Sequence, residues 1–234
     1  MTEASARNRL TGDEWQFNLD DMSCTLNQPT VRRLLEQMHS EADRVDPPLL
    51  ERAKGKGGTE RAALLSEAFI PVDRDAGRLL YALARNAPPG LCVEFGTSFG
   101  ISTIYLAAAA RDRGGGTVIT TEIDESKANR AQGYLENAGL LEYVDLRVGD
   151  ALETLSDIDP DVTFVFIDGM KELYLPVLRL LEPALRPGTL VVGDDIELFP
   201  KQVESYLAYV RDPGSSYVSV LVPIGDGMEL SVRN

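Results

Sequence analysis

The sequence predicts a doubly wound α/β domain, because short β-type runs alternate with helical segments from residue 91 onward. Two of these runs, 162–167 and 189–193, are apolar throughout, as expected of central strands that a parallel sheet buries on both faces. Two further β-type runs, 217–222 and 228–232, flank a short loop with two glycines, which predicts an antiparallel hairpin at one sheet edge. We therefore expect a seven-stranded, mostly parallel sheet with a C-terminal hairpin.

The remaining elements follow in chain order. Glycine, or Pro-Gly, after a periodic segment marks a helix end, and we expect such ends at Gly139 and Gly188. The expected strands are 91–95, 117–123, 143–148, 162–167, 189–192, 217–222 and 228–232. The expected helices between them are 101–111, 125–137, 151–155, 173–185 and 201–210.

The chain before the first strand has a different pattern. Helical periodicity at 31–44 and 73–85 flanks a flexible loop at 54–58, and a Pro-Pro-Gly break precedes the first strand. We interpret residues 1–72 as an N-terminal helical cap that lies over the sheet. Residues 73–234 are then the main, ligand-binding domain.

Composition and charge argue against several classes of function. The formal charge is −14, from 23 Lys and Arg against 37 Asp and Glu; it repels phosphate backbones, so we expect no nucleic-acid partner. No apolar run reaches the roughly 20 residues of a membrane span and no secretory signal is visible, so we expect no membrane partner. Cys24 and Cys92 lie far apart in the sequence, which fits a reducing cytoplasm. The single histidine, His39, lies in a polar helical stretch, which argues against histidine catalysis and zinc sites.

The first candidate site begins at Glu94, where a strand ends and a helix opens. Gly96 permits a sharp turn against which a ligand can lie, and Gly100 allows close approach at the helix start, whose free N–H groups can hold a carboxylate. Ser102, on the first helical turn, adds a hydroxyl. The pattern E-x-G-x-x-x-G differs from the G-x-G-x-x-G of dinucleotide sites, and a plain strand-to-helix turn is the alternative.

Two further acids follow the next two expected strands. Glu122 is placed to accept both ribose hydroxyls of a nucleoside, and Asp150 to accept an adenine amino group. Singly, Glu122 could be a solvated strand end and Asp150 a cap for the helix from Ala151. Together with the glycine turn, they put three ligand-type motifs at the carboxyl ends of consecutive strands, where such folds bind ligands.

From about residue 73 to its end, the sequence resembles class I methyltransferases and, within them, the catechol O-methyltransferase-like group. The resemblance implies a Rossmann-like fold and S-adenosylmethionine as cofactor, with Glu94 and Gly96 along its methionine part and Ser102 at its carboxylate. It also implies that Glu122 contacts the ribose and that Asp150 contacts the adenine. The first 70 residues have no counterpart in this resemblance. The cofactor-binding residues expected in this way are Glu94, Gly96, Thr97, Ser98, Gly100, Ser102, Glu122, Asp150, Ala151 and Asp168.

A second group of acids follows the fourth and fifth expected strands. Asp168, Asp194 and Asp195 are expected to converge there, and three close carboxylates repel unless a cation or protons intervene. Oxygen ligands suit Mg²⁺ or Ca²⁺, and such a metal would hold both oxygens of a catechol and lower the pKa of the attacking hydroxyl. Lys171, three residues after the first acid, would act as general base if its own pKa is depressed.

The resemblance implies similar roles. In the catechol O-methyltransferase-like group the metal sits on an Asp after the fourth strand and an Asp-Asn pair after the fifth, with a lysine as base. Asp168, Asp194 and Lys171 match that pattern, while Asp195 stands where Asn is usual. The alternatives are an acid that touches the cofactor, an Asp-Asp turn cap and a solvated lysine.

These patterns favour a metal-dependent O-methyltransferase that acts on a small, catechol-like molecule. A metal-independent O- or N-methyltransferase is the first alternative. An NAD-dependent oxidoreductase is disfavoured by the absent G-x-G-x-x-G, and a non-enzymatic nucleoside-binding protein is the remaining possibility. The sequence does not identify the acceptor, and the oligomeric state stays open, with a homodimer through the N-terminal helices as one arrangement.

Overall fold

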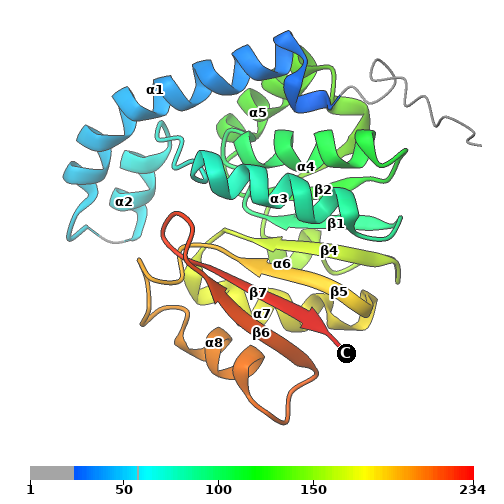
Figure 1. The fold of residues 1–234 in the computed structure, drawn as a ribbon. Helices are drawn as coiled ribbons and strands as arrows, with labels where there is room; N and C mark the ends of the chain where they lie inside the picture. Colours follow the sequence, from blue (N-terminus) through cyan, green and yellow to red (C-terminus); the bar gives the residue numbers. More distant parts are fainter. Residues whose placement is uncertain (1–23, 57) are drawn as a thin grey trace, which may run out of the picture.

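The computed structural model describes residues 24–56 and 58–234. They contain a seven-stranded sheet with the order β3-β2-β1-β4-β5-β7-β6 (Figure 1). The first five strands run parallel, and β7 is antiparallel to both of its neighbours, which confirms the expected parallel sheet and hairpin. The strands are β1 (Leu91–Phe95), β2 (Val118–Glu122), β3 (Val144–Val148), β4 (Val162–Ile167), β5 (Leu185–Gly193), β6 (Tyr217–Val222) and β7 (Met228–Arg233).

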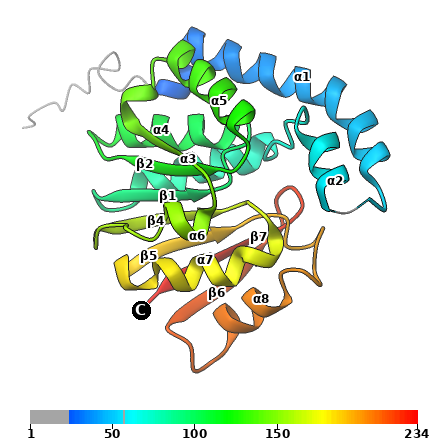
Figure 2. The same ribbon diagram turned by 180° about the vertical axis from the view of Figure 1, so that it is seen from behind.

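Helices cover both faces of the sheet. One layer holds α3, α4 and α5, and the other holds α6, α7 and α8 (Figures 1 and 2). Side chains alternate along β4: Phe164 and Phe166 pack into the first layer, whereas Val165 and Ile167 pack into the second. The helices are α1 (Pro29–Ala53), α2 (Gly58–Leu65), α3 (Arg74–Asn86), α4 (Ile101–Asp112), α5 (Glu125–Ala138), α6 (Ala151–Thr154), α7 (Tyr174–Leu181) and α8 (Glu204–Arg211).

Strand register aligns the carboxyl ends of the three central strands. Phe95 at the end of β1 is level with Ile167 of β4, and Ile167 is level with Gly193 of β5. The next residues therefore emerge side by side at one edge of the sheet. They are Gly96, Asp168 and Asp194, so the topology alone brings two acids of the second group beside the glycine turn.

The expected boundary between the seventh helix and β5 is wrong. We expected a helix to residue 185 and a strand at 189–192, but α7 ends at Leu181 and β5 already begins at Leu185. Leu185 pairs with Val162, and the register then shifts before Phe164 pairs with Leu190. This irregularity accommodates the exposed Pro-Gly pair at 187–188 within the strand, where such residues are tolerated.

The N-terminal helices also differ from expectation. α1 continues past residue 44 and through Pro47 and Pro48, α2 was not expected, and His39 is buried within α1 instead of lying on a polar face. A tertiary contact anchors the proline-containing part of α1. The buried side chain of Asp46 accepts hydrogen bonds from the backbone amides of Phe69 (2.8 Å) and Ile70 (2.7 Å).

α1 crosses the helical layer of α4 and α5 and leads to α2, on the side of the molecule toward which the parallel strands point (Figures 1 and 2). The loop between β6 and β7 lies on that same side. The division of the chain at residue 72 stays a prediction. In the part of the chain that the structure describes, no helix is long and apolar enough to cross a membrane.

Candidate active site

The turn between β1 and α4 leaves no room for a side chain at its start. Gly96 has φ of 103°, and a Cβ there would lie 2.8 Å from the carbonyl oxygen of Asp168. Gly100 precedes α4 in a left-handed conformation and, as glycine, offers no side chain to cap the helix. The first amide groups of α4 therefore have no side-chain cap, and the start of such a helix suits an anionic group.

Glu94 lies at the carboxyl end of β1 with no exposed surface. Its Oε2 accepts hydrogen bonds from the hydroxyls of Thr103 (2.5 Å) and Thr120 (2.6 Å). Its Oε1 is buried and has no hydrogen-bond partner among the described residues. Burial raises the pKa of Glu94 to about 7, although the hydroxyls of Ser102, Thr103 and Thr120 favour the charged form. A buried carboxylate oxygen without a partner fits a ligand that brings a hydrogen-bond donor or a positive charge.

Glu122 reaches from the end of β2 to the glycine turn. Its Oε2 accepts from the backbone amide of Ser98 at 2.7 Å, and its Oε1 accepts from the amide of Asp124 at 3.0 Å. Ser98 has φ of 47°, which is rare for a residue with a side chain, and its amide points toward Glu122 in this conformation. Glu122 is therefore part of the turn and not a freely solvated strand end, and its contact with a ribose stays a prediction.

Asp150 caps the short helix α6, which was the alternative expected for it. Its Oδ1 accepts from the backbone amide of Leu152 at 2.8 Å, and the neighbouring Ala151 is buried. Apolar side chains near these strand ends are unusually exposed, with Ile123 at 74% and Met170 at 62% of their surface. Such side chains suit a flat apolar group of a ligand.

The second group of acids comes together around Lys171. The ammonium of Lys171 lies 2.9 Å from Oδ1 of Asp168 and 2.7 Å from Oδ2 of Asp195, and only 12% of its side chain is exposed. It also donates to the hydroxyl of Tyr174 at 2.8 Å, and that hydroxyl donates to the carbonyl of Asp194 at 3.0 Å. The three acids and the lysine thus share one network at the ends of β4 and β5.

The pKa of Lys171 is shifted opposite to the expectation. Burial alone would lower the pKa of this amine, but the charges of Asp168 and Asp195 outweigh burial and hold the pKa above its usual value. Burial also raises the pKa of Asp194, and the charges of Asp168 and Asp195 raise it further. The lysine is therefore a firmly protonated ion-pair partner in this arrangement.

The acids are not arranged as a ready-made metal site. Among residues 24–56 and 58–234, no group of three or more His, Cys, Asp or Glu side chains is placed as metal ligands. The reason is visible at Lys171, because its ammonium takes up the space between Asp168 and Asp195. The predicted metal role of Asp168, Asp194 and Asp195 stays a prediction.

Several residues that shape the site were not expected from the sequence. Thr103 and Thr120 hold Glu94, and Lys127 contacts the glycine turn from α5. A signal for Lys127 exists in the sequence, because it lies four residues before Ala131 on the buried stripe of α5. The threonines carry no comparable signal, since their role depends on the pairing of separate elements.

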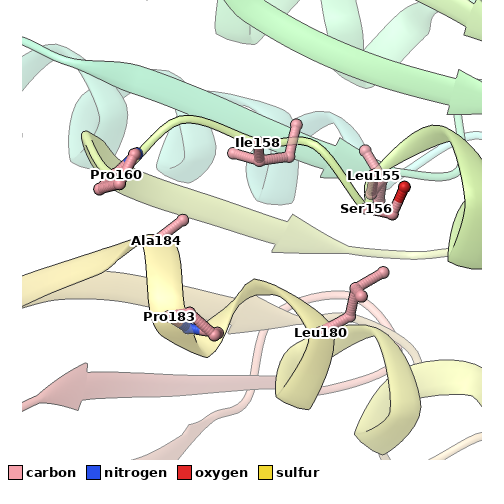
Figure 3. A pocket seen from close by; sticks show the side chains of 7 residues that line it. All are labelled: Leu155, Ser156, Ile158, Pro160, Leu180, Pro183 and Ala184. Atoms are coloured by element: carbon pink, nitrogen blue, oxygen red, sulfur yellow. The ribbon is translucent and has the colours of Figure 1, made fainter.

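A small cavity of about 130 Å³ lies elsewhere, between the segment after α6 and the segment after α7 (Figure 3). These segments lead into β4 and β5, so the cavity is near the opposite ends of the strands from the acids. Its lining residues are Leu155, Ser156, Ile158, Pro160, Leu180, Pro183 and Ala184. None of the residues expected at the candidate site lines it.

The chain is similar to known methyltransferases. The family described as "Methyltransferase domain" matches residues 93–196. A probable O-methyltransferase of Mycobacterium tuberculosis is 31% identical over 65% of this chain and 68% of its own length. A catechol O-methyltransferase of Niastella koreensis is 33% identical over 56% of this chain and 62% of its own length. The corresponding figures for the catechol O-methyltransferase of Mus musculus are 29%, 86% and 77%.

Solved structures show the same fold. The O-methyltransferase TomG of Streptomyces achromogenes, in complex with S-adenosylmethionine, has a TM-score of 0.62 and 25% identity over 83% of this chain and 99% of that chain. An O-methyltransferase of Bacillus cereus, in complex with S-adenosylhomocysteine, has a TM-score of 0.64 and 24% identity over 86% of this chain and 91% of that chain.

Proposed function

Since the chain belongs to the catechol O-methyltransferase-like group of class I S-adenosylmethionine-dependent methyltransferases, we propose that it methylates a hydroxyl of a small catechol-like molecule with the help of a divalent cation. The observation that carries this proposal is the network of Lys171 with Asp168, directly after β4, and Asp195, shortly after β5. β4 pairs with β1, the strand that leads into the glycine turn. This arrangement supports the proposal, because side chains suited to activating an acceptor hydroxyl lie beside a turn suited to binding a methyl donor.

The residues around the turn fit S-adenosylmethionine, which supplies a methyl group on a sulfonium. Glu94 Oε1 is buried, has no hydrogen-bond partner among the described residues and can face the methionine part. The start of α4 has no side-chain cap and carries Ser102 on its first turn, so it suits the methionine carboxylate. Glu122 offers its remaining lone pairs to the ribose. Asp150 and the exposed Ile123 are near the place expected for the adenine.

The donor chemistry of the acids fits a hard divalent cation. Two carboxylates pair with the single charge of Lys171, and the raised pKa of Asp194 reflects burial and the charges of these two neighbours. Carboxylate oxygens are preferred by Mg²⁺ and Ca²⁺, and a cation bound there would lower the pKa of an acceptor hydroxyl. Lys171 is the proposed base for the hydroxyl proton, and its ammonium would first have to release a proton to solvent so that the neutral Nζ can accept one. A cation that drew Asp168 and Asp195 away from Lys171 would weaken the ion pairs that keep it protonated.

A second candidate is a methyltransferase that needs no metal. The observation that favours it is that Lys171 already neutralises Asp168 and Asp195, as an internal cation would. Asp168 would then contact the cofactor, and Lys171 would keep Asp168 and Asp195 in position through its ion pairs. The acceptor would be bound by the surrounding loops alone.

A calorimetric titration of Mg²⁺ into protein saturated with S-adenosylhomocysteine separates the two candidates. The variant Asp194→Asn removes one proposed ligand, and Asp226→Asn, in the loop between β6 and β7, is the matched control. Metal dependence requires binding to the parent and the control that is lost in Asp194→Asn. Absence of binding to the parent would leave the metal-independent enzyme.

A further inference from the structure

Lys127 is a buried cation on the first turn of α5, apart from the acids around Lys171. Only 8% of its surface is exposed. Its ammonium donates a hydrogen bond to the carbonyl of Ala68 at 2.9 Å and to the hydroxyl of Ser98 at 3.3 Å. Lysine is rarely buried to this extent without a specific set of partners. Both partners lie far from Lys127 in the sequence, Ala68 by 59 residues and Ser98 by 29.

Ser98 is the residue through which this lysine reaches the cofactor turn. Its hydroxyl donates to the carbonyl of Phe69 at 2.8 Å while it accepts from Lys127. Its backbone amide donates to Glu122 at 2.7 Å, and this direction depends on the positive φ of Ser98. A strained backbone conformation persists where its surroundings hold it from several sides.

The same contacts reach the N-terminal helices. The carbonyls of Ala68 and Phe69 face Lys127 and Ser98, while the amide of Phe69 is held by Asp46 of α1. The ring of Phe69 packs edge-on against Phe99, with 4.6 Å between the ring centroids. A continuous set of contacts therefore joins α1 to the turn that ends at Gly100.

We infer that Lys127 is a positioning residue for the cofactor: it fixes Ser98 so that the amide of Ser98 orients Glu122, and it makes cofactor affinity depend on the segment at Ala68. This inference rests on the proposed function only in that S-adenosylmethionine binds at this turn. Lys127 itself does not touch the cofactor. Its effect passes through Ser98 and Glu122, and the acceptor side of the site is not involved.

The matched pair Lys127→Met and Arg130→Met tests this role by calorimetric titration with S-adenosylhomocysteine. Arg130 lies one turn further along α5, its guanidinium is 4.0 Å from the centre of the Phe99 ring, and it pairs with Glu67 at 3.1 Å. Both changes remove a cation that packs on the same aromatic ring. We expect the Kd for S-adenosylhomocysteine to rise at least tenfold in Lys127→Met and to change less than twofold in Arg130→Met. Equal effects of the two variants would reduce Lys127 to a packing role and overturn the inference.

A double-mutant cycle with Ser98→Ala supplies the readout that a purely structural role would not move. If Lys127 acts through Ser98, Lys127→Met changes the Kd less than threefold once the Ser98 hydroxyl is absent. Additive effects overturn the inference. If Lys127→Met does not fold, Ser98→Gly is the substitute, because glycine tolerates the positive φ but lacks the hydroxyl. We then expect weaker binding of S-adenosylhomocysteine to Ser98→Gly. The same affinity as the parent would overturn the inference. A parent protein that fails to bind S-adenosylhomocysteine would instead contradict the proposed cofactor.

Discussion

The backbone amide of Asp168 donates a hydrogen bond to the carbonyl of Phe95 at 2.9 Å, so the pairing of β4 with β1 continues past the end of the strand. This bond holds the backbone of Asp168 close to Gly96, the first glycine of the turn. Asp168, which pairs with Lys171, and Gly96, which opens the glycine turn, are therefore fixed relative to one another by the backbone. Each of the two halves of the site constrains what the other can accept.

Gly96→Ala is expected to damage both stability and cofactor binding. Its Cβ would meet the carbonyl of Asp168 at 2.8 Å, and φ of 103° is strained for alanine. We expect a loss of about 1–3 kcal/mol in the free energy of unfolding, measured with urea. The control is Gly133→Ala, in the helix α5 with no atom within 4 Å of the new Cβ, which should stabilise the protein by up to about 1 kcal/mol. Equal stabilities of the two variants would contradict the close contact.

Glu94 should make stability depend on pH. Its pKa is about 7 in the folded chain, against an ordinary value of 4.5, so folding favours the protonated form. The stabilisation is complete below about pH 4.5 and is lost as the pH rises through 7, which corresponds to roughly 3 kcal/mol. Urea unfolding of the parent and of Glu94→Gln at pH 5 and pH 8 measures the difference. Parallel pH profiles would mean that Glu94 is ionised in the folded chain at pH 5.

Glu122→Ala should weaken binding of S-adenosylhomocysteine by about 1.5–3 kcal/mol, because charge-assisted hydrogen bonds are lost. It also frees the amide of Ser98, which now donates to Glu122 at 2.7 Å. Asp145→Ala, an exposed acid on β3, is the control for the change in net charge. Calorimetry measures both affinities. Unchanged affinity in Glu122→Ala would remove Glu122 from the cofactor site.

Lys171→Met separates acceptor chemistry from cofactor binding. We expect turnover of a catechol to fall by about 10²–10⁴-fold, as is typical when a general base is lost, with the affinity for S-adenosylhomocysteine within twofold of the parent. Steady-state kinetics and calorimetry give the two quantities. Intact turnover would mean that Lys171 serves only to neutralise Asp168 and Asp195 and to keep them in position, as in the metal-independent candidate.

The sheet could be predicted from the sequence because its central strands are buried and apolar and its other strands are short β-type runs between turn residues. β1, β4 and β6 have the same bounds as expected, since their patterns depend on local residue type. β5 differs because Pro187 and Gly188 normally end an element, yet pairing with β4 continues on both sides of an irregularity. α1 differs for a related reason: contacts of Asp46 with a distant segment offset the effect of Pro47.

The candidate site was predictable in position but not in charge state. Asp168 and Lys171 are three residues apart in sequence, and the topology places Asp195 beside them. The pKa of Lys171 depends on the balance between burial, which lowers it, and two nearby carboxylates, which raise it. The spacing of residues in the sequence does not reveal that balance. The helical spacing of α5 indicates that Lys127 is buried, but it does not indicate its hydrogen-bond partners, which lie 29 and 59 residues away in sequence.

β7 lies between β5 and β6, although β6 precedes β7 in the chain. During synthesis, a nascent chain that has reached Val222 has no neighbour for β6, and β5 keeps an open edge next to Asp194. The edge of β5 is therefore paired only after the last strand of the chain has been made, whereas β1, β2 and β3 gain their neighbours much earlier. The strand ends that carry Glu94, Glu122 and Asp150 are thus paired within the sheet before the open edge next to Asp194 is closed.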